Sequence, residues 1–216
     1  TATMNFGQDS TFAGAKPKGT YTDDNDIGNF QYAPPAGYLS LCTANLPDPT
    51  IIDGSDYFET VLYTGDGTSS NQISVNFAPD FTWMKPRNQA RSHRLVDSVR
   101  GYPVLSSDST AAEGAGGYLR LNSTGFLLTT SAQDYNGSGN TYVGWNWKAG
   151  GTAVSNTDGS ITSQVSANVD AGFSIVGYTG TGSGGATVGH GLGAVPDFLI
   201  IRRRDPGEAW PVWVGG

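Results

Sequence analysis

Apolar and polar residues alternate in several short segments of the chain. In "ISVNF", residues 73–77, every second residue is apolar, and in "TYVGWNWK" the apolar positions are Val143, Trp145 and Trp147. Successive side chains of a β-strand point to opposite faces, so each segment predicts a strand with one buried face. The phase of the second segment predicts that Trp145 and Trp147 lie in the core together with Val143.

Two more strands are predicted in "GYLRLNSTGFLLTTS". Leu119 and Leu121 alternate with polar residues, residues 122–125 have the composition of a turn, and Phe126 and Leu128 resume the alternation. This arrangement is typical of a β-hairpin. The 31 glycines and the many serines and threonines favour short strands and tight turns over long helices, so we expect an all-β chain.

One line of the sequence occurs twice. "FETVLYTGDGT", residues 58–68, and "FSIVGYTGTGS", residues 173–183, are identical at six of eleven positions, and "PDF" recurs at residues 79–81 and 196–198. The shared Tyr-Thr-Gly-x-Gly predicts a strand that runs into a turn, where glycine adopts a positive φ without a Cβ clash. The chain is therefore predicted to contain a duplicated β module.

The repeat divides the chain into four parts. Residues 50–151 match the roughly 100 residues of a complete antiparallel sandwich, and residues 1–49 are predicted to be the closing segment of another β domain. Residues 152–171 contain few large apolar residues and predict a linker or an edge hairpin. Residues 172–216 are predicted to be the first strands of a truncated second copy, too short to bury a core alone. We expect this copy to pack on the first sandwich, another subunit or further chain. Because the sequence begins with Thr, we expect a piece of a longer polypeptide.

Composition excludes several classes of partner. The net charge is −7, and the longest basic run is Arg202, Arg203 and Arg204, so we expect no binding to nucleic acid. No apolar run approaches the roughly 20 residues of a membrane span, so we expect no membrane insertion. The single Cys42 cannot form an intrachain disulfide.

Motifs for catalysis and cofactors are weak or missing. "GTGSGG", residues 180–185, matches a dinucleotide-binding fingerprint, but the residues that follow cannot form the helix such a site requires, so we interpret it as a turn. There is no nucleophile elbow and no Walker loop, and His93 and His190 lie far apart without metal-ligand spacing. We expect no cofactor and no catalytic residue.

Two groups of residues are candidate ligand sites. Aromatic residues beside Asp, Asn and Gly can stack on sugar rings while polar groups bond the hydroxyls, which makes glycan-binding candidates of Tyr118, Asp134, Tyr135, Asn136 and Tyr142.

The second group lies in "TDDNDIG", which resembles part of a calcium loop. Asp24 and Asp26 are the candidate ligands, but the bidentate Glu expected at the twelfth loop position would fall on Pro35. We therefore expect no metal site and interpret these residues as solvated loop carboxylates, with a calcium site as the alternative.

Taken together, the longer motifs resemble a known arrangement of domains. "NFGQDSTF" followed by "FQYAPPAGYLSLCTANLPDPTI" is similar to the closing segment of the SPRY-like domains of tailed-phage virion proteins. "YTGDG…FAPDFTWMKPR…HRLVDSVRG…TYVGWNWKAGG" and "FSIVGYTGTGSGGATVGHGLGAVPDFLIIRRRD…AWPVW" resemble the concanavalin-like (laminin-G-type) repeats that follow it there. The resemblance covers nearly the whole chain.

This resemblance implies a concanavalin-like jelly-roll sandwich in a tail-fibre segment on the exterior of the virion, made in the host cytoplasm. It implies a homotrimer that contacts other virion proteins and attaches to the host surface, for example to a polysaccharide, with each repeat adding length to the fibre. It brings no catalytic residue. The alternatives are a purely architectural adaptor or decoration protein and a polysaccharide depolymerase with a pair of Asp residues.

Overall fold

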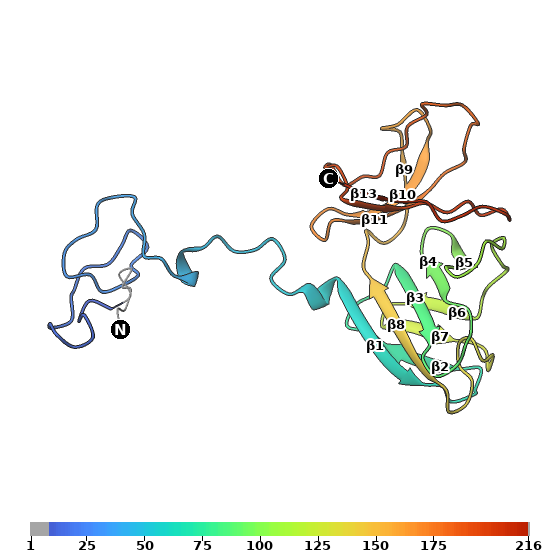
Figure 1. Ribbon diagram of the computed structural model, residues 1–216, viewed down its shortest axis with the longest axis horizontal. Helices are drawn as coiled ribbons and strands as arrows, with labels where there is room; N and C mark the ends of the chain where they lie inside the picture. Colours follow the sequence, from blue (N-terminus) through green and yellow to red (C-terminus); the bar gives the residue numbers. More distant parts are fainter. Residues whose placement is uncertain (1–8, 216) are drawn as a thin grey trace. The chain divides into compact units, whose positions relative to one another are not determined.

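The computed structural model describes residues 9–215 (Figure 1). Contacts divide the chain into two units, Thr1–Ile52 and Asp53–Gly216. The first contains a short antiparallel bridge between Tyr21 and Phe30 and the 3-10 helix η1 (Thr43–Asn45). The predicted β segment 1–49 falls in this unit, and its first eight residues lie outside the described part of the chain. In residues 9–215, no helix is long and apolar enough to cross a bilayer.

The second unit begins with the 3-10 helix η2 (Gly54–Asp56) and continues into two antiparallel sheets (Figure 1). A five-stranded sheet has the order β1-β8-β3-β4-β5, and a three-stranded sheet has the order β2-β7-β6. Their strands are β1 (Phe58–Thr64), β2 (Asn71–Ser74), β3 (Phe81–Pro86), β4 (Arg94–Asp97), β5 (Gly101–Ser106), β6 (Leu119–Asn122), β7 (Gly125–Leu128) and β8 (Thr141–Trp147). The all-β prediction is confirmed, and so is the β6–β7 hairpin, in which Asn122 pairs with Gly125.

Apolar side chains from both sheets meet between the layers. Met84 of β3 and Phe126 of β7 have no exposed surface, and Leu119 and Leu128 pack with them. Burying one such side chain stabilises the fold by about 1.5–3 kcal/mol. The cluster consists of Ile73, Val75, Phe77, Met84, Val96, Val104, Leu119, Phe126, Leu128, Tyr135 and Tyr142.

The inner face of β8 is not the predicted one. Tyr142 and Asn146 are fully buried on the side of the sandwich core, whereas Trp145 and Trp147 lie half-buried on the opposite side of the sheet. The prediction that these tryptophans share the sandwich core was therefore wrong.

Hydrogen bonds explain why a polar residue occupies the inner face. The Asn146 Oδ1 atom accepts a bond from the Thr82 hydroxyl at 2.8 Å, and its Nδ2 atom donates to the Glu59 carbonyl at 3.2 Å. A buried amide with both ends bonded carries no unpaired-group penalty. The alternating apolar residues Val143, Trp145 and Trp147 consequently face a second apolar layer, on the outer side of the sheet.

Aromatic rings build that outer layer. The Trp147 ring centroid lies 4.9 Å from that of Phe58 and 5.2 Å from that of Phe81, and Trp83 meets Trp145 edge to face. Phe173, from later in the chain, stacks on Trp147 at 6.1 Å. The outer face of the first sandwich is thus partly covered by the second copy of the repeat.

The rest of the second unit forms two small sheets. β9 (Val154–Asn156), β10 (Ser163–Asn168) and β11 (Phe173–Gly177) form one with the order β11-β10-β9, and β12 (Phe198–Ile200) pairs with β13 (Val212–Val214) in the other. Residues 152–171, predicted to be a linker or an edge hairpin, contain β9 and β10, which pair antiparallel.

The register of the small hairpin reproduces that of an earlier one. In β3–β4, Phe81 pairs with Asp97, and in β12–β13, Phe198 pairs with Val214. Both residues of the pair have moved by the same number of positions, 198 − 81 = 117 and 214 − 97 = 117. Hence β12–β13 is the second copy of β3–β4, just as β11 is the second copy of β1.

Polar contacts hold the β12–β13 hairpin to the first sandwich. The Arg204 guanidinium lies 2.6 Å from the Glu113 carboxylate, and the Glu113 backbone N–H donates to the Arg204 carbonyl at 2.8 Å. The Trp210 indole N–H donates to the Ser109 carbonyl at 3.0 Å. These contacts give the second copy a fixed attachment to the loop after β5.

Candidate functional site

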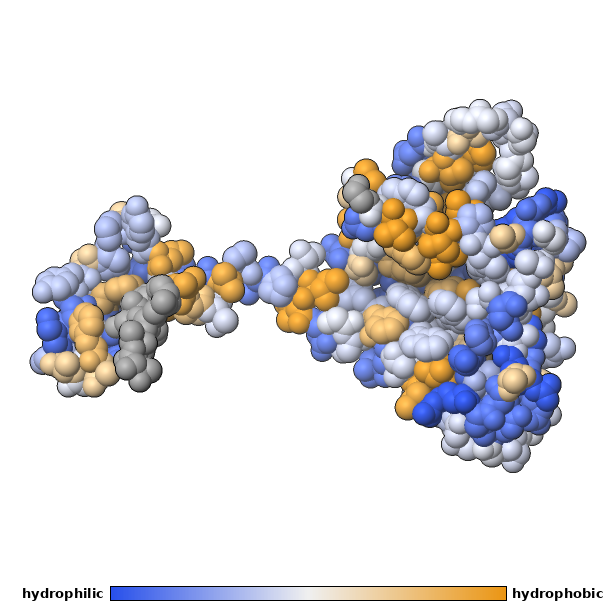
Figure 2. All heavy atoms as spheres, viewed as in Figure 1, coloured by the Kyte–Doolittle hydropathy of each residue, from blue (hydrophilic) through white to orange (hydrophobic). Residues whose placement is uncertain are grey.

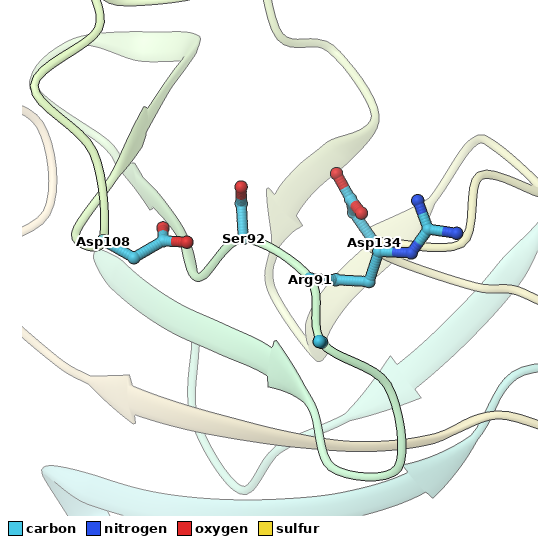
Figure 3. A pocket seen from close by; sticks show the side chains of 5 residues that line it. Arg91, Ser92, Asp108 and Asp134 are labelled. Carbon is cyan, nitrogen blue, oxygen red and sulfur yellow. The ribbon is translucent and has the colours of Figure 1, made fainter.

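Three loops meet at one end of the first sandwich and border an open hollow of about 510 Å³. They are the β3–β4 loop, the loop after β5 and the β7–β8 loop, which the order β8-β3-β4-β5 brings side by side. The hollow is open to solvent over most of its extent. Its lining residues are Ala90, Arg91, Ser92, Asp108 and Asp134 (Figure 3).

The two carboxylates of the hollow are held differently. The Asp108 Oδ1 atom accepts the backbone N–H of His93 at 3.0 Å, and the residue is exposed. Asp134 forms an ion pair with Arg94, and about a fifth of its side chain remains exposed. In the view of Figure 3, Ser92 lies between the two carboxylates. Such groups can accept hydrogen bonds from hydroxyl groups of a ligand.

An aromatic pair extends from Asp134 to the surface. The Arg94 guanidinium lies 5.8 Å from the ring centroid of Tyr135, which is buried, and the Tyr118 ring lies 5.6 Å from Tyr135. Tyr118 is 49% exposed. The structure therefore brings Tyr118, Asp134 and Tyr135 together as one cluster, in which Tyr118 presents the accessible ring.

The phenol of Tyr135 stays protonated at neutral pH. Burial raises its pKa, the nearby Arg94 charge opposes this, and Asp134 and Tyr118 add to the increase, which leaves the pKa at about 12.

Asn136 is fully buried, and its amide holds a turn. Its Nδ2 atom donates to Asp66 Oδ1 at 2.7 Å and to the Thr68 carbonyl at 2.9 Å. Its Oδ1 atom accepts from the Asp66 N–H at 3.1 Å and from Asn71 at 2.8 Å. Both polar atoms of the Asn136 side chain are therefore hydrogen-bonded within the protein, and Asn136 is not among the residues proposed to contact a ligand.

Tyr142 is likewise fully buried. Its hydroxyl donates to the Gln133 carbonyl at 2.7 Å and accepts the Gly137 N–H at 2.8 Å, while its ring stacks on Tyr63 at 4.9 Å. These contacts fix the start of β8 and the loop before it. Tyr142 therefore anchors the loop that carries Asp134 and presents no surface to a ligand.

The repeated Tyr-Thr-Gly-x-Gly phrase has a steric explanation in the first copy. A Cβ atom on Gly65 would lie 2.3 Å from the Gly137 carbonyl oxygen, and one on Gly67 would lie 2.9 Å from the Ser138 side chain. Gly67 also has φ +72°. The turn needs glycine because the β7–β8 loop passes directly against it.

The candidate calcium ligands lie in a loop organised by a different residue. The Asp23 carboxylate accepts the backbone N–H groups of Asn25, Ile27 and Ser40 and the Asn45 side-chain N–H at 2.7–3.0 Å. Burial opposes ionisation of Asp23, but these donors outweigh it and lower its pKa. N–H donors thus occupy the positions around the Asp23 carboxylate where a bound cation would lie.

Asp24 and Asp26 make local contacts in the same loop. Asp24 Oδ2 accepts the Gly37 N–H at 2.7 Å, and Asp26 Oδ1 lies 3.5 Å from the Thr22 hydroxyl. Within residues 9–215, no group of three or more His, Cys, Asp or Glu residues is arranged to hold a metal ion. His190 Nδ1 accepts the Leu192 N–H at 3.2 Å.

Sequence reasoning missed the other residues of the hollow. Arg91, Ser92 and Asp108 come from loops that become neighbours only through the strand order of the five-stranded sheet. Nothing in their local sequence indicates a site. Arg94, which positions Asp134, occurs at the start of a strand and carries no motif.

Comparisons with known proteins give one relative and one family. The SPbeta prophage-derived uncharacterized protein YomG of Bacillus subtilis (strain 168) is 33% identical over 93 residues, 43% of this chain. The chain spans about a tenth of that relative's length, since the aligned part is 11% of it. No solved structure gives a significant match. The family model described as "Domain of unknown function (DUF7483)" matches residues 53–216, well over half of the sequence, and the chain therefore belongs to the DUF7483 family.

Proposed function

We propose that this chain is a non-enzymatic segment of a phage virion protein, of the tail-fibre type, that attaches to the host surface. Its similarity to a prophage-derived protein supports the phage origin. The observation that carries the attachment role is the exposed Tyr118 ring, which packs on Tyr135, the residue next to Asp134 in the chain. Asp134 itself pairs with Arg94 and lines the loop-end hollow. The residues proposed to contact the ligand are Tyr118, Asp108 and Asp134.

The chemistry of this cluster fits a sugar. An exposed aromatic ring stacks on the apolar face of a sugar ring, and carboxylates nearby accept hydroxyl hydrogen bonds. Arg94 holds Asp134 in place, so little side-chain freedom is lost on binding. The ligand class is therefore a polysaccharide of the host envelope, bound weakly at one site and more tightly by an assembly that presents several sites.

Assembly is the second part of the proposal. Exposed apolar side chains support association with further chains, as a homotrimer and with other virion proteins on the outside of the particle. They gather on β12–β13 and its flanks, and Figure 2 shows apolar side chains on the visible face of this part of the unit. The exposed residues are Val195, Phe198, Leu199, Ile200, Ile201, Val212, Trp213 and Val214. Sedimentation velocity over a range of concentrations measures the copy number.

Binding to purified host envelope polysaccharide and to a glycan array tests the attachment role. We expect the oligomeric chain to bind, Tyr118→Ala and Asp108→Asn to weaken binding about tenfold each, and Tyr32→Ala, an 80% exposed tyrosine of the first unit, to leave it unchanged. Failure of the assembled wild-type chain to bind any glycan would contradict the attachment role. Release of reducing ends from the polysaccharide would instead identify a depolymerase.

A purely architectural role is the second candidate. The same exposed apolar hairpin supports it, because a chain that contacts only virion proteins needs such a surface and no ligand site. A map of the intact particle separates the two roles. Attachment requires the Tyr118 end of the sandwich to face outward, whereas an architectural role predicts that it is covered by other chains.

A further inference from the structure

β8 is the strand that completes the first sandwich. It lies between β1 and β3 and pairs with both, so that Trp147 is opposite Phe58 on one side and Phe81 on the other. Tyr142, near its start, stacks on Tyr63 of β1. Without β8, the strands β1 and β3 would each expose an edge and several aromatic rings.

The second copy keeps the residues that β8 contacts. Phe58, Tyr63 and Phe81 correspond to Phe173, Tyr178 and Phe198. Tyr178 is 45% exposed and Phe198 is 59% exposed, whereas Tyr63 is half-buried in the first copy. Val61, which lies 3.3 Å from a Cβ built on Gly144 of β8, corresponds to Val176. The residues that contact β8 are therefore repeated, but in residues 9–215 no strand pairs with the free edge of β11 or of β12.

The free edge of β11 is the one that corresponds to the β8 edge of β1. The backbone N–H and C=O groups of alternate residues in a strand point to opposite edges. In β1 these groups of the odd-numbered residues face β8, since the N–H of Gly65, directly after β1, donates to the Asn140 carbonyl at 2.8 Å. The equivalent positions in β11 are even-numbered.

The neighbouring strand β10 uses the other edge of β11. A Cβ on Gly150, which precedes β9 in the chain, would lie 2.3 Å from the Ala167 carbonyl oxygen. This contact indicates that the backbone N–H and C=O groups of the odd-numbered residues of β10 face the β9 side. The backbone groups of its even-numbered residues, such as Ser166, then face their odd-numbered partners in β11, such as Ile175. The backbone groups of the even-numbered Ser174 and Val176 consequently face the open edge of β11.

The glycines of the repeated turn give an independent indication. Gly65 is required because its missing Cβ makes room for the Gly137 carbonyl of the loop before β8. Gly180, its counterpart, has no atom within 4 Å of a Cβ built on it and no positive φ. Within residues 9–215, therefore, neither a close neighbouring atom nor the backbone conformation requires glycine at position 180. A loop that approached as residues 136–138 approach Gly65 would require it.

We propose that the second copy binds a β8-type strand and the loop before it, in antiparallel pairing with the open edges of β11 and β12. The partner is a strand with the β8 pattern, in which a Tyr stacks on Tyr178 and a Trp five residues later is flanked by Phe173 and Phe198. Addition of a strand to open edges gives affinity through backbone hydrogen bonds and specificity through alternate side chains.

A peptide with the sequence of residues 133–150, "QDYNGSGNTYVGWNWKAG", is the probe. Fluorescence anisotropy of the labelled peptide, titrated with the full 216-residue chain, measures binding. We expect saturable binding to the wild-type chain, at least about tenfold weaker binding to Gly180→Ala, because the new methyl group collides with the incoming carbonyl, and unchanged binding to Gly184→Ala. Gly184 is a matched control, since it too has no atom within 4 Å and no positive φ.

A second readout locates the bound peptide. Hydrogen exchange of the amides of Ser174 and Val176 should slow when the peptide binds, while amides of β1 should not change. Phe198→Ser should also weaken binding about tenfold, because the ring is removed from beside the incoming Trp.

Three results would overturn the proposal. They are failure of the wild-type chain to bind the peptide, equal binding by Gly180→Ala and Gly184→Ala, and unchanged exchange of the Ser174 and Val176 amides when the peptide binds. None of these readouts depends on glycan binding.

Discussion

Gly65 and Gly180 occupy the same position of the repeat but have different surroundings. A Cβ on Gly65 would lie 2.3 Å from a backbone oxygen, whereas one on Gly180 would meet nothing within 4 Å. A backbone atom cannot move aside as the end of a flexible side chain can. The same residue type is therefore structurally required in the first copy, whereas within residues 9–215 no neighbouring atom requires it in the second.

A pair of alanine substitutions tests this difference. We expect Gly65→Ala to lower the free energy of unfolding by about 1–3 kcal/mol, the usual cost of overpacking, and Gly180→Ala to change it by less than about 0.5 kcal/mol. Denaturant unfolding followed by tryptophan fluorescence measures both. Equal effects of the two substitutions would show that the steric argument is wrong.

Asp23 predicts a pH-dependent loop in the first unit. Its folded-state pKa is lowered, so its hydrogen bonds contribute stability that is complete above the unfolded-state value of about 4 and declines as the pH falls below it. We expect the amides of Ser40 and Ile27 to lose protection from hydrogen exchange between pH 6 and pH 3, after correction for intrinsic rates.

The control for Asp23 is a neutral residue of the same shape. Asp23→Asn should reduce protection of the Ser40 amide at pH 6 and remove most of its dependence on pH, since no carboxylate titrates. Protection that stays constant from pH 6 to pH 3 in the wild-type chain would be inconsistent with a role for the Asp23 charge.

Only part of the candidate site could be predicted from residue types. Tyr118 and Asp134 were recognised because they are aromatic and acidic residues next to Asn- and Gly-rich loops. Asp134 lines the hollow, and Tyr118 packs on the neighbouring Tyr135. Burial is decided by tertiary contacts, so the sequence could not distinguish the exposed Tyr118 from the fully buried Asn136 and Tyr142. The position of Asp108 at the hollow could not be predicted from its neighbours in the sequence, because only the strand order of the sheet brings it there.

At the scale of elements, the attachment of β12–β13 to the first sandwich depends on Glu113. Its side chain is 12% exposed and accepts from both Arg100, which is 10% exposed, and Arg204, which is 58% exposed. Burial opposes the charge of Glu113, but the hydrogen bonds and charges of the two arginines outweigh it and lower the pKa. The two ion pairs share a carboxylate and differ in solvent access.

This difference predicts unequal costs for removing the two arginines. Arg100→Met should destabilise the second unit by about 3 kcal/mol, because it leaves the buried Asp97 carboxylate without an ion-pair partner and Glu113 with only the exposed Arg204. Arg204→Met should cost less than about 1 kcal/mol, since exposed ion pairs contribute little. Thermal unfolding measures the loss of stability in both variants, and a larger loss for Arg204→Met would contradict this prediction.

Strand patterns predicted the elements better than their orientation. The β6–β7 hairpin and the duplication follow directly from alternation and identity in the sequence. The orientation of β8 did not, because both of its faces are apolar enough to bury, and the outer layer of Phe58, Phe81 and Trp147 mimics a core. A period of two identifies faces without stating which one points inward.

At the scale of the whole molecule, the chain divides between Ile52 and Asp53. Residues 46–50 and 52–56 are exposed on both sides of this division. Exposed backbone with few contacts is the preferred site of proteolytic cleavage. The two units should therefore be separable by a protease that acts on accessible chain.

Limited proteolysis with thermolysin is expected to cut first near Ile51 or Ile52 and to leave a stable fragment that begins close to Asp53. This fragment should unfold at the same temperature as the corresponding transition of the intact chain, because its core residues all lie within it. Mass spectrometry identifies the cut. Initial cleavage inside residues 58–147 would show that the division is placed wrongly.

The pairing of Phe58 with Trp147 also determines how the first sandwich responds to mechanical force. The chain enters the sandwich at β1 and leaves it at β8, and these two residues are direct neighbours, about 5 Å apart across the sheet. A module connected in this way adds almost no length to a stretched polymer. A pull along the chain would open the β1–β8 ladder one hydrogen bond at a time, like a zip, instead of loading all its bonds together in shear.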